Sequence, residues 1–202
     1  SHTCMGGASN ALAYGVGSTE YANLIHNQFS FVNVPESIRF ELVGTLDPGC
    51  TAKDVILHIL WKYASKSETL DRSMEFGGPG LKSLSMDERA TLSKMANQCI
   101  EKTGICQPDE VTIDRLLTKR KDLDEEGIRS NFVLPDEGAV YHGGVFKIDL
   151  NKIRPMVAHP GNPDVGITSD PTKQITNPNS DIAVSKTDHV LRVSFSVKPL
   201  SL

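Results

Sequence analysis

Residues 34–60 read VPESIRFELVGTLDPGCTAKDVILHIL, and this stretch decides the fold class. Apolar and charged residues alternate over Ile38–Leu42, which is typical of a half-buried β-strand. An Asp-Pro-Gly turn follows, and Thr51 with Asp54 forms a capping-box pattern that opens a helix over about 52–66. The apolar face of that helix is expected to contain Val55, Ile56, Ile59, Leu60 and Tyr63. The stretch therefore predicts a strand, a turn and a helix in direct succession.

Further elements continue this alternation along the chain. Ser85 and Glu88 form a second capping box, and Gly104 suits the position after a helix, so one helix is expected from Ser85 to Gly104. The same reasoning predicts a strand at 73–76 with a glycine-rich turn after it, a helix at 109–121, and strands at 145–150 and 191–197. Residues 162–188 are polar and contain several prolines, which predicts a long loop. The order of the elements predicts α/β architecture.

Three side chains capable of catalysis or ligand binding occupy the first positions, Ser1-His2-Thr3. A glycine-rich turn and a short helix are expected after them, and then a second helix that begins near Ser18. An imidazole titrates near neutral pH, so His2 could serve as a general acid or base, and the hydroxyls could hold a carboxylate. A solvated terminal histidine is the competing interpretation, and local sequence alone leaves both open.

Composition limits the remaining classes. The 202 residues carry a net charge of −4, which disfavours a main role in binding nucleic acid or membrane surfaces. No apolar run approaches the roughly 20 residues of a membrane span, so a soluble, intracellular protein of the cytoplasm or an organelle matrix is expected. The cysteines, Cys4, Cys50, Cys99 and Cys106, lack metal-ligand spacing, and reduced thiols are expected; a nucleophilic Cys4 remains a weaker alternative. The charge-dense stretch 117–131 predicts a solvated surface.

Several ordered motifs resemble one enzyme family. They are SHTCMGGASNALAYGVGSTEYANLI at the start, the stretch at 34–60, RSMEFGGPGLKSLSMDERATLSKM, PDEVTIDRL, and DEGAVYHGGVFKIDLNKIRPMVAHPGNP. In this order they resemble the aconitase/3-isopropylmalate dehydratase large-subunit family over about residues 1–163. The isopropylmalate and homoaconitate branch is more similar than the citrate–isocitrate branch. The fold that this resemblance implies is a segment of the multi-unit α/β/α architecture of that family.

The resemblance implies three units and a specific chemistry. The units are a C-terminal piece of a first α/β unit at 1–36, a middle unit at 37–135, and the start of a third unit with a divergent, loop-rich tail at 136–202. The implied activity is a hydro-lyase that isomerises a hydroxy polycarboxylate of the 2-isopropylmalate, homocitrate or citrate type through dehydration and rehydration at a [4Fe–4S] cluster. Ser1 would contact the substrate, and His2 would protonate the departing hydroxyl. A small swivelling subunit or domain is the implied partner.

The sequence also departs from the family pattern. The Asp that precedes the Ser-His-Thr motif in the family would lie one position before Ser1, and no cysteine follows Cys106 in these 202 residues, where the family has its cluster ligands. Ser93-Lys94-Met95 and Gln98 stand where the family has Cys-Asn-Met and then Glu. We therefore expect the chain to be a partial copy without metal ligands, inactive alone and prone to association through exposed apolar faces. A non-catalytic α/β module of the same family is the alternative.

Overall fold

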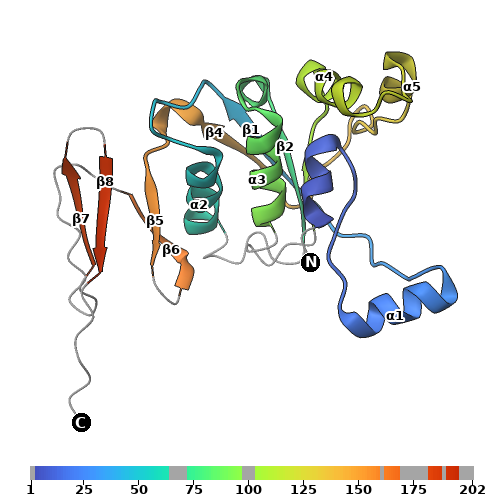
Figure 1. Cartoon of the computed structure of the whole chain (residues 1–202), viewed down its shortest axis with the longest axis horizontal. Helices are drawn as coiled ribbons and strands as arrows, with labels where there is room; N and C mark the ends of the chain where they lie inside the picture. Colours follow the sequence, from blue (N-terminus) through green and yellow to red (C-terminus); the bar gives the residue numbers. More distant parts are fainter. Residues whose placement is uncertain are drawn as a thin grey trace, which may run out of the picture.

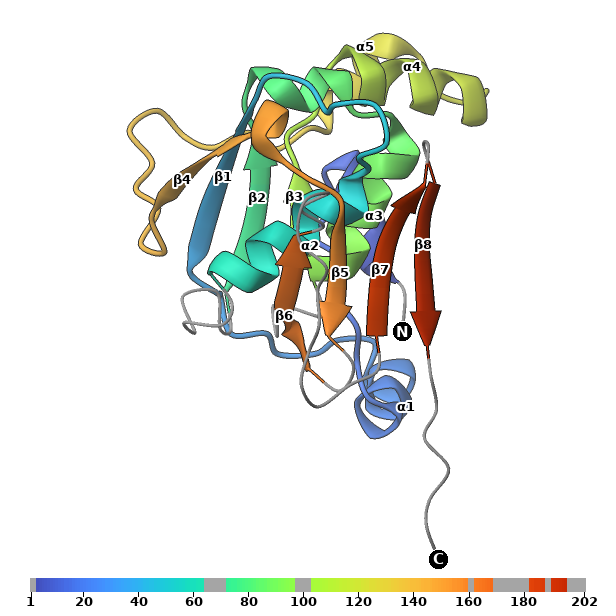
Figure 2. The same cartoon turned by 90° about the vertical axis from the view of Figure 1, so that its left-hand side faces the viewer.

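The computed structural model describes residues 3–63, 72–96, 103–159, 162–168, 182–187 and 190–195, the last three as backbone. At its centre is a parallel four-stranded sheet with the order β3-β2-β1-β4 (Figures 1 and 2). The strands are β1 Ser37–Val43, β2 Ser73–Gly77, β3 Thr103–Cys106 and β4 Val145–Asp149. The α/β architecture expected from the sequence is confirmed.

Helices α2 Ala52–Lys62 and α3 Met86–Ala96 cover one face of the sheet (Figure 2). Right-handed crossovers that step twice in the same direction place both helices on the same side. Apolar residues of β1 and β2 point toward them and form one core with both helices: Ile38, Phe40, Leu42, Met74, Phe76, Val55, Ile56, Ile59, Leu60, Leu92 and Ala96. The alternation seen at 38–42 is therefore the pattern of a strand buried on its helix-covered face.

Both predicted capping boxes are present. Asp54 accepts hydrogen bonds from the backbone N–H of Thr51 at 2.8 Å and from its hydroxyl at 2.9 Å. Its second oxygen accepts the backbone N–H of Met156 at 2.7 Å, so the cap also fixes the strand β5 Met156–His159 beside α2. Glu88 accepts the backbone N–H of Ser85 at 2.8 Å in the same manner at α3.

Two expectations about secondary structure are wrong. The helix expected from Ser85 to Gly104 is described over Met86–Ala96, and it cannot reach Gly104, because Gly104 lies within β3. The loop expected at 162–188 contains β6 Asn162–Thr168, which pairs antiparallel with β5, and β7 Ile182–Thr187, which pairs with β8 Val190–Phe195. Hairpin pairing supplies backbone hydrogen bonds to these polar residues, which the composition of the segment does not reveal.

The remaining elements lie at the edges of the sheet. The 3₁₀ helix η3 Pro79–Ser83 follows β2, and α4 Glu110–Lys119 and α5 Glu125–Ser130 follow β3 at the carboxyl edge. The 3₁₀ turn η5 Leu150–Lys152 follows β4. The unit boundaries at 36 and 135 stay a prediction, and β4 from the expected third unit pairs with β1 from the middle unit.

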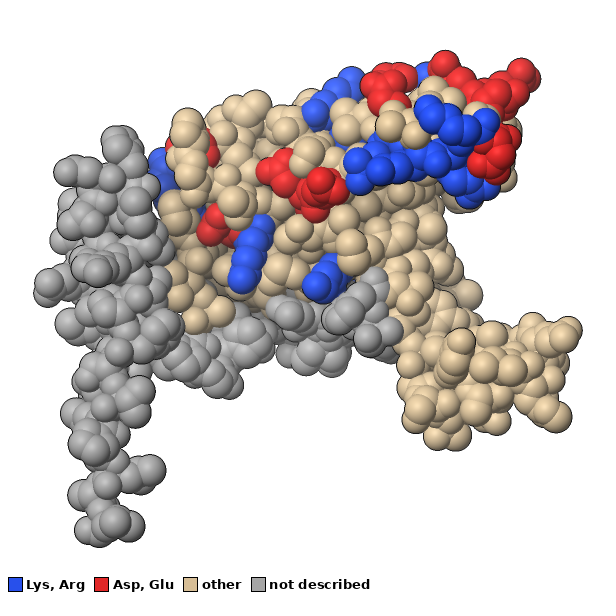
Figure 3. All heavy atoms as spheres, viewed as in Figure 1, with Lys and Arg blue, Asp and Glu red and all other residues tan. Residues whose placement is uncertain are grey.

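The N-terminal segment forms the 3₁₀ helix η1 Thr3–Ser9 and helix α1 Ser18–Asn27. Helix α1 extends away from the sheet and buries no residue (Figure 1). Charged side chains gather over α4 and α5 on the face seen in Figure 3, whereas α1 shows none there. Stretch 117–131 is mostly exposed, as its composition predicts. In the part of the chain that the structure describes, no helix has the length and apolar character needed to cross a membrane.

Candidate functional site

The turn that follows Ser1-His2 is fixed tightly against the sheet. Gly7 of η1 lies so close to the carbonyl oxygen of Gly104 that a Cβ at residue 7 would overlap with it, and Ser93 Oγ lies nearby. Thr103 donates a hydrogen bond of 2.6 Å to the carbonyl of Ala13. Two glycines therefore let η1 contact β3 and α3 backbone to backbone.

Asn10 joins this turn to two distant segments. Its backbone has a φ of 67°, in the left-handed region that Asn tolerates better than most residues. Its Nδ2 donates to the carbonyl of Cys106 at 3.4 Å, and its Oδ1 accepts the backbone N–H of Val133 at 2.9 Å. The segment that carries the Ser-His-Thr motif is therefore held at its C-terminal side by the end of β3 and by the chain after α5.

The Ser-His-Thr motif and the positions that depart from the family pattern fall only partly within the described structure. Ser1 and His2 lie outside the described residues, as does Gln98, so their roles stay predictions. On α3, Ser93 is fully buried with its Oγ 3.7 Å from Cys106 Sγ, whereas Lys94 is exposed. Helix α3 thus presents a cation to solvent where the family resemblance implies an asparagine.

The described cysteines do not fit a metal or iron–sulfur centre. Cys4 and Cys106 are buried, Cys50 is partly buried, and all three are free thiols. Burial raises the pKa of Cys106 to about 11, against a weaker opposing effect of the Ser93 hydrogen bond, so its sulfur is a protonated thiol at neutral pH. No group of three His, Cys, Asp or Glu side chains within the described residues could hold a metal ion. Cys4 is 1% exposed, which also disfavours it as a nucleophile.

A polar constellation occupies the face of the sheet opposite α2 and α3. Arg39 of β1 is only 8% exposed; its Nε donates to Glu41 at 2.7 Å and its Nη2 donates to Gln107 at 2.6 Å. Its guanidinium also lies over the ring of Tyr141, whose hydroxyl donates to Glu75 at 2.9 Å. No sequence pattern predicted this cluster, although a charged residue in the middle of a central strand was a usable signal.

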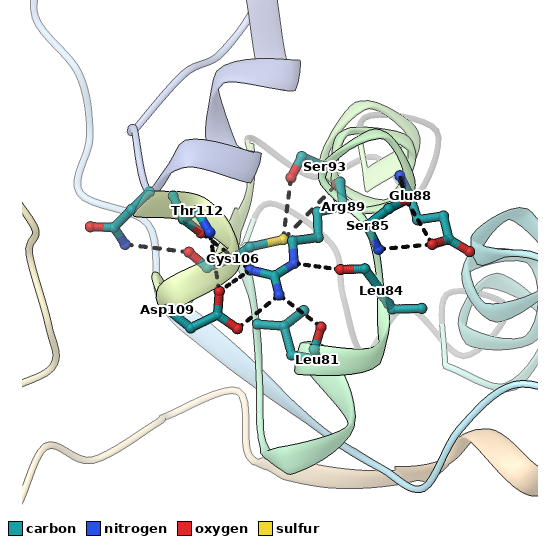
Figure 4. Close-up of polar contacts among 10 residues, drawn as sticks. Leu81, Leu84, Ser85, Glu88, Arg89, Ser93, Cys106, Asp109 and Thr112 are labelled. Atoms are coloured by element: carbon teal, nitrogen blue, oxygen red, sulfur yellow. Dashed lines mark hydrogen bonds and ion pairs between the residues drawn. The ribbon is translucent and has the colours of Figure 1, made fainter. Parts of the chain in front are cut away.

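Arg89 of α3 forms a further polar constellation (Figure 4). Its side chain is fully buried and forms a bidentate ion pair with Asp109 at 2.7 and 2.8 Å. It also donates to the carbonyls of Leu84 at 3.1 Å and Leu81 at 2.9 Å. Burial of Asp109 opposes its ionisation, but the hydrogen bonds and charge of Arg89 outweigh this and hold the pKa of that carboxyl below its ordinary value.

These features define an α/β protein in which a small-residue turn is packed on a parallel sheet directly after a Ser-His-Thr motif. The chain matches the Aconitase family (aconitate hydratase) over residues 1–198, and it belongs to this family. The family resemblance carried by the sequence motifs is thereby confirmed.

The relatives include several dehydratases. The 3-isopropylmalate dehydratase large subunit of Caldicellulosiruptor bescii is 39% identical over 170 residues, which cover 81% of this chain and 36% of the relative. The 2,3-dimethylmalate dehydratase large subunit of Eubacterium barkeri is 38% identical over 164 residues, covering 81% and 37%. Aconitase htyD of Aspergillus rugulosus is 37% identical over 166 residues, covering 81% and 18%. The chain thus spans little more than a third of the first two relatives.

Proposed function

We propose that the protein to which these residues belong is a hydro-lyase that dehydrates a hydroxy polycarboxylate and rehydrates the product at the neighbouring carbon. The observation that carries this proposal is the match to the Aconitase family over residues 1–198. Relatives whose names denote dehydratases of 3-isopropylmalate and 2,3-dimethylmalate support malate derivatives as the substrate class.

Within this proposal His2 has the central chemical role. Hydroxide is a poor leaving group, so an acid must deliver a proton to the departing hydroxyl, and a neutral-range imidazole suits this task. The Ser1 hydroxyl would donate a hydrogen bond to a substrate carboxylate and orient it. The packing of Gly7 against Gly104 supports these roles, because it immobilises the turn five residues after His2.

The cofactor and the partner are likewise proposals. A [4Fe–4S] cluster is typical of the family, but the described cysteines do not fit one, and we assign no step of the reaction to it. The relatives named large subunits favour a small subunit as partner. The intracellular location stays a prediction.

A non-catalytic module of the same family is the second candidate. The exposed Lys94 on α3 favours it, because it substitutes a cation for the amide implied by the family pattern. A positive charge at this place would alter the electrostatics of any site between α3 and the Ser-His-Thr motif.

The assay uses the full-length native protein with 2-isopropylmalate, 2,3-dimethylmalate, homocitrate and citrate, and it follows the ultraviolet absorbance of the unsaturated product. We expect turnover with at least one of them. His2→Asn should lower kcat by about 10²- to 10⁴-fold. His26→Asn on α1 is the matched control and should leave kcat unchanged. Absence of turnover with all four substrates contradicts the hydro-lyase proposal.

The second candidate has its own test. If Lys94 and Gln98 prevent catalysis, the double variant K94N/Q98E should gain activity that the native protein lacks. An active native protein that K94N/Q98E leaves unchanged excludes this candidate.

A further inference from the structure

A hollow of about 330 Å³ lies at the carboxyl ends of β1, β2 and β3. Its polar walls come from the Arg39 and Arg89 constellations, and its apolar walls come from η3 and the start of α4. The polar part of the lining consists of Arg39, Glu41, Lys82, Gln107 and Asp109, together with the backbone of Gly78. Ligands of α/β proteins bind in crevices at this edge of the sheet, and the volume suits a small metabolite. None of these residues receives a role from the family resemblance.

The walls of the hollow are fixed before any ligand arrives. Arg39 is held by Glu41 and Gln107, and Asp109 is held by the two hydrogen bonds from Arg89. A Cβ at Gly77 would overlap with the Arg39 guanidinium, so that position accommodates the cluster only as glycine. Gly78 has a φ of 87°, and a Cβ there would crowd Glu41 Oε2. A preformed site of this kind loses little conformational entropy on binding.

One cation, Lys82, and one carboxylate oxygen of Glu41 remain available to a ligand. Glu41 uses Oε1 for Arg39, and the contacts resolved among the described residues leave its Oε2 without a hydrogen bond. Lys82 of η3 is exposed, and within the same described part its Nζ has no ion pair. The other two charged groups of the lining are paired, Arg39 with Glu41 and Asp109 with Arg89.

We propose that this hollow binds a small zwitterion, an aliphatic α-amino acid, whose carboxylate pairs with Lys82 and whose ammonium pairs with Glu41. The formal charges of the lining, two cations and two carboxylates, sum to zero, which disfavours a polyanion such as a nucleotide phosphate. Leu81, Pro79 and Pro108 supply apolar contact for the aliphatic side chain. This assignment is independent of the proposed hydro-lyase activity.

The test is isothermal titration calorimetry of the full-length protein at low ionic strength with L-norvaline, pentanoate and butylamine. The last two compounds each retain one of the two charges of norvaline. We expect norvaline to bind with a Kd on the order of 1 mM or tighter, and both analogues to bind at least about tenfold more weakly. Tight binding of pentanoate would overturn the zwitterion assignment, as would absence of norvaline binding.

Two variants assign the contacts. Lys82→Met removes the cation and should weaken norvaline binding about tenfold, because a partly exposed ion pair contributes modestly. The affinity for butylamine should stay unchanged. Glu41→Gln keeps an acceptor for Arg39 and should weaken norvaline binding while leaving the affinity for pentanoate unchanged. Lys53→Met, an exposed lysine on α2 outside the hollow, is the matched control and should bind norvaline like the native protein. Unchanged norvaline affinity in both pocket variants overturns the proposal, whether or not the protein shows hydro-lyase turnover.

Discussion

Arg89 and Asp109 form a buried two-point ion pair that ties the first turn of α3 to the N-cap of α4. Through the carbonyls of Leu81 and Leu84 the same guanidinium also fixes η3 and the residue after it. One side chain thus joins η3, α3 and the start of α4 at the carboxyl edge of the sheet (Figure 4). Two of them line the hollow described above.

Breaking this pair should destabilise the fold strongly. Asp109→Asn leaves a fully buried guanidinium without its counter-charge, and we expect the free energy of unfolding to fall by about 3–5 kcal/mol. Arg89→Met should reduce it less, because the Asp109 side chain retains 15% exposure and can hydrate. Urea denaturation measures both changes. Asp122→Asn, in the exposed pair with Arg120, is the control and should leave stability unchanged. Equal stabilities of D109N and D122N would contradict the structural role of the buried pair.

Acid should weaken the same interaction. The pKa of Asp109 in the folded protein lies below the ordinary value of 3.8. Its stabilising contribution is therefore complete above that value and decreases as pH falls through the lower folded pKa. The difference in unfolding free energy between the native protein and Asp109→Asn should be constant from pH 7 to about 5 and should shrink toward pH 3. A difference independent of pH over this range would be inconsistent with an ionised Asp109.

Substitution of Gly7 by alanine should destabilise the protein far more than the same substitution of Gly15. Gly7→Ala drives a Cβ into the carbonyl of Gly104, so η1 must move away from β3, and we expect a loss of about 1–3 kcal/mol or more. A methyl group at Gly15 would meet no heavy atom within 4 Å, and Gly15→Ala should be neutral or slightly stabilising. Thermal unfolding of the two variants measures the contrast. Equal melting temperatures would show that η1 does not contact β3 as described.

The α1 arm, residues 18–34, should cause association when the 202 residues are expressed alone. Ile25 is 63% exposed and Phe31 is 91% exposed, and no residue of α1 is buried. The double variant I25K/F31K should shift the chain toward a monomer in size-exclusion chromatography with light scattering, without lowering its melting temperature. Val133→Lys changes an exposed apolar residue outside the arm and should leave the association unaltered. A native chain that stays monomeric at high concentration would contradict the expectation.

Local sequence patterns predicted the elements whose signals are short-range. The capping boxes at Thr51 and Ser85 and the alternation at 38–42 each depend on residues a few positions apart, and all three are present in the structure. Gly104 shows where such signals are ambiguous. Glycine commonly follows a helix, but here it lies within β3, where a Cβ would collide with Ala96 of α3 and where the Gly7 turn packs closely. A glycine at position 104 is therefore explained by its contacts with Ala96 and with Gly7, and Gly7 lies far away along the chain.

The partners within the polar constellations could not be predicted from the sequence, for the same reason. Arg39 reaches Gln107 across 68 positions, and Arg89 meets Asp109 only because β3 returns the chain beside α3. The motif resemblance identified the family, yet it assigned roles only to positions that match the family pattern. Neither Lys82 nor Glu41 is among the positions that received a role in this way.

The strand order has a consequence for synthesis on the ribosome. Strands β1, β2 and β3 can pair as soon as residue 106 has emerged, but the outer edge of β1 waits for β4, which ends at Asp149. Pairing there begins with two backbone hydrogen bonds. The N–H of Gly143 donates to the Ser37 carbonyl at 3.0 Å, and the backbone N–H of Arg39 donates to the Gly144 carbonyl at 2.9 Å. Until then β1 presents an open row of backbone donors and acceptors that a neighbouring nascent chain can occupy. Translation pauses between residues 107 and 144 therefore expose this chain most to misassembly, and chaperone engagement over that interval would protect it.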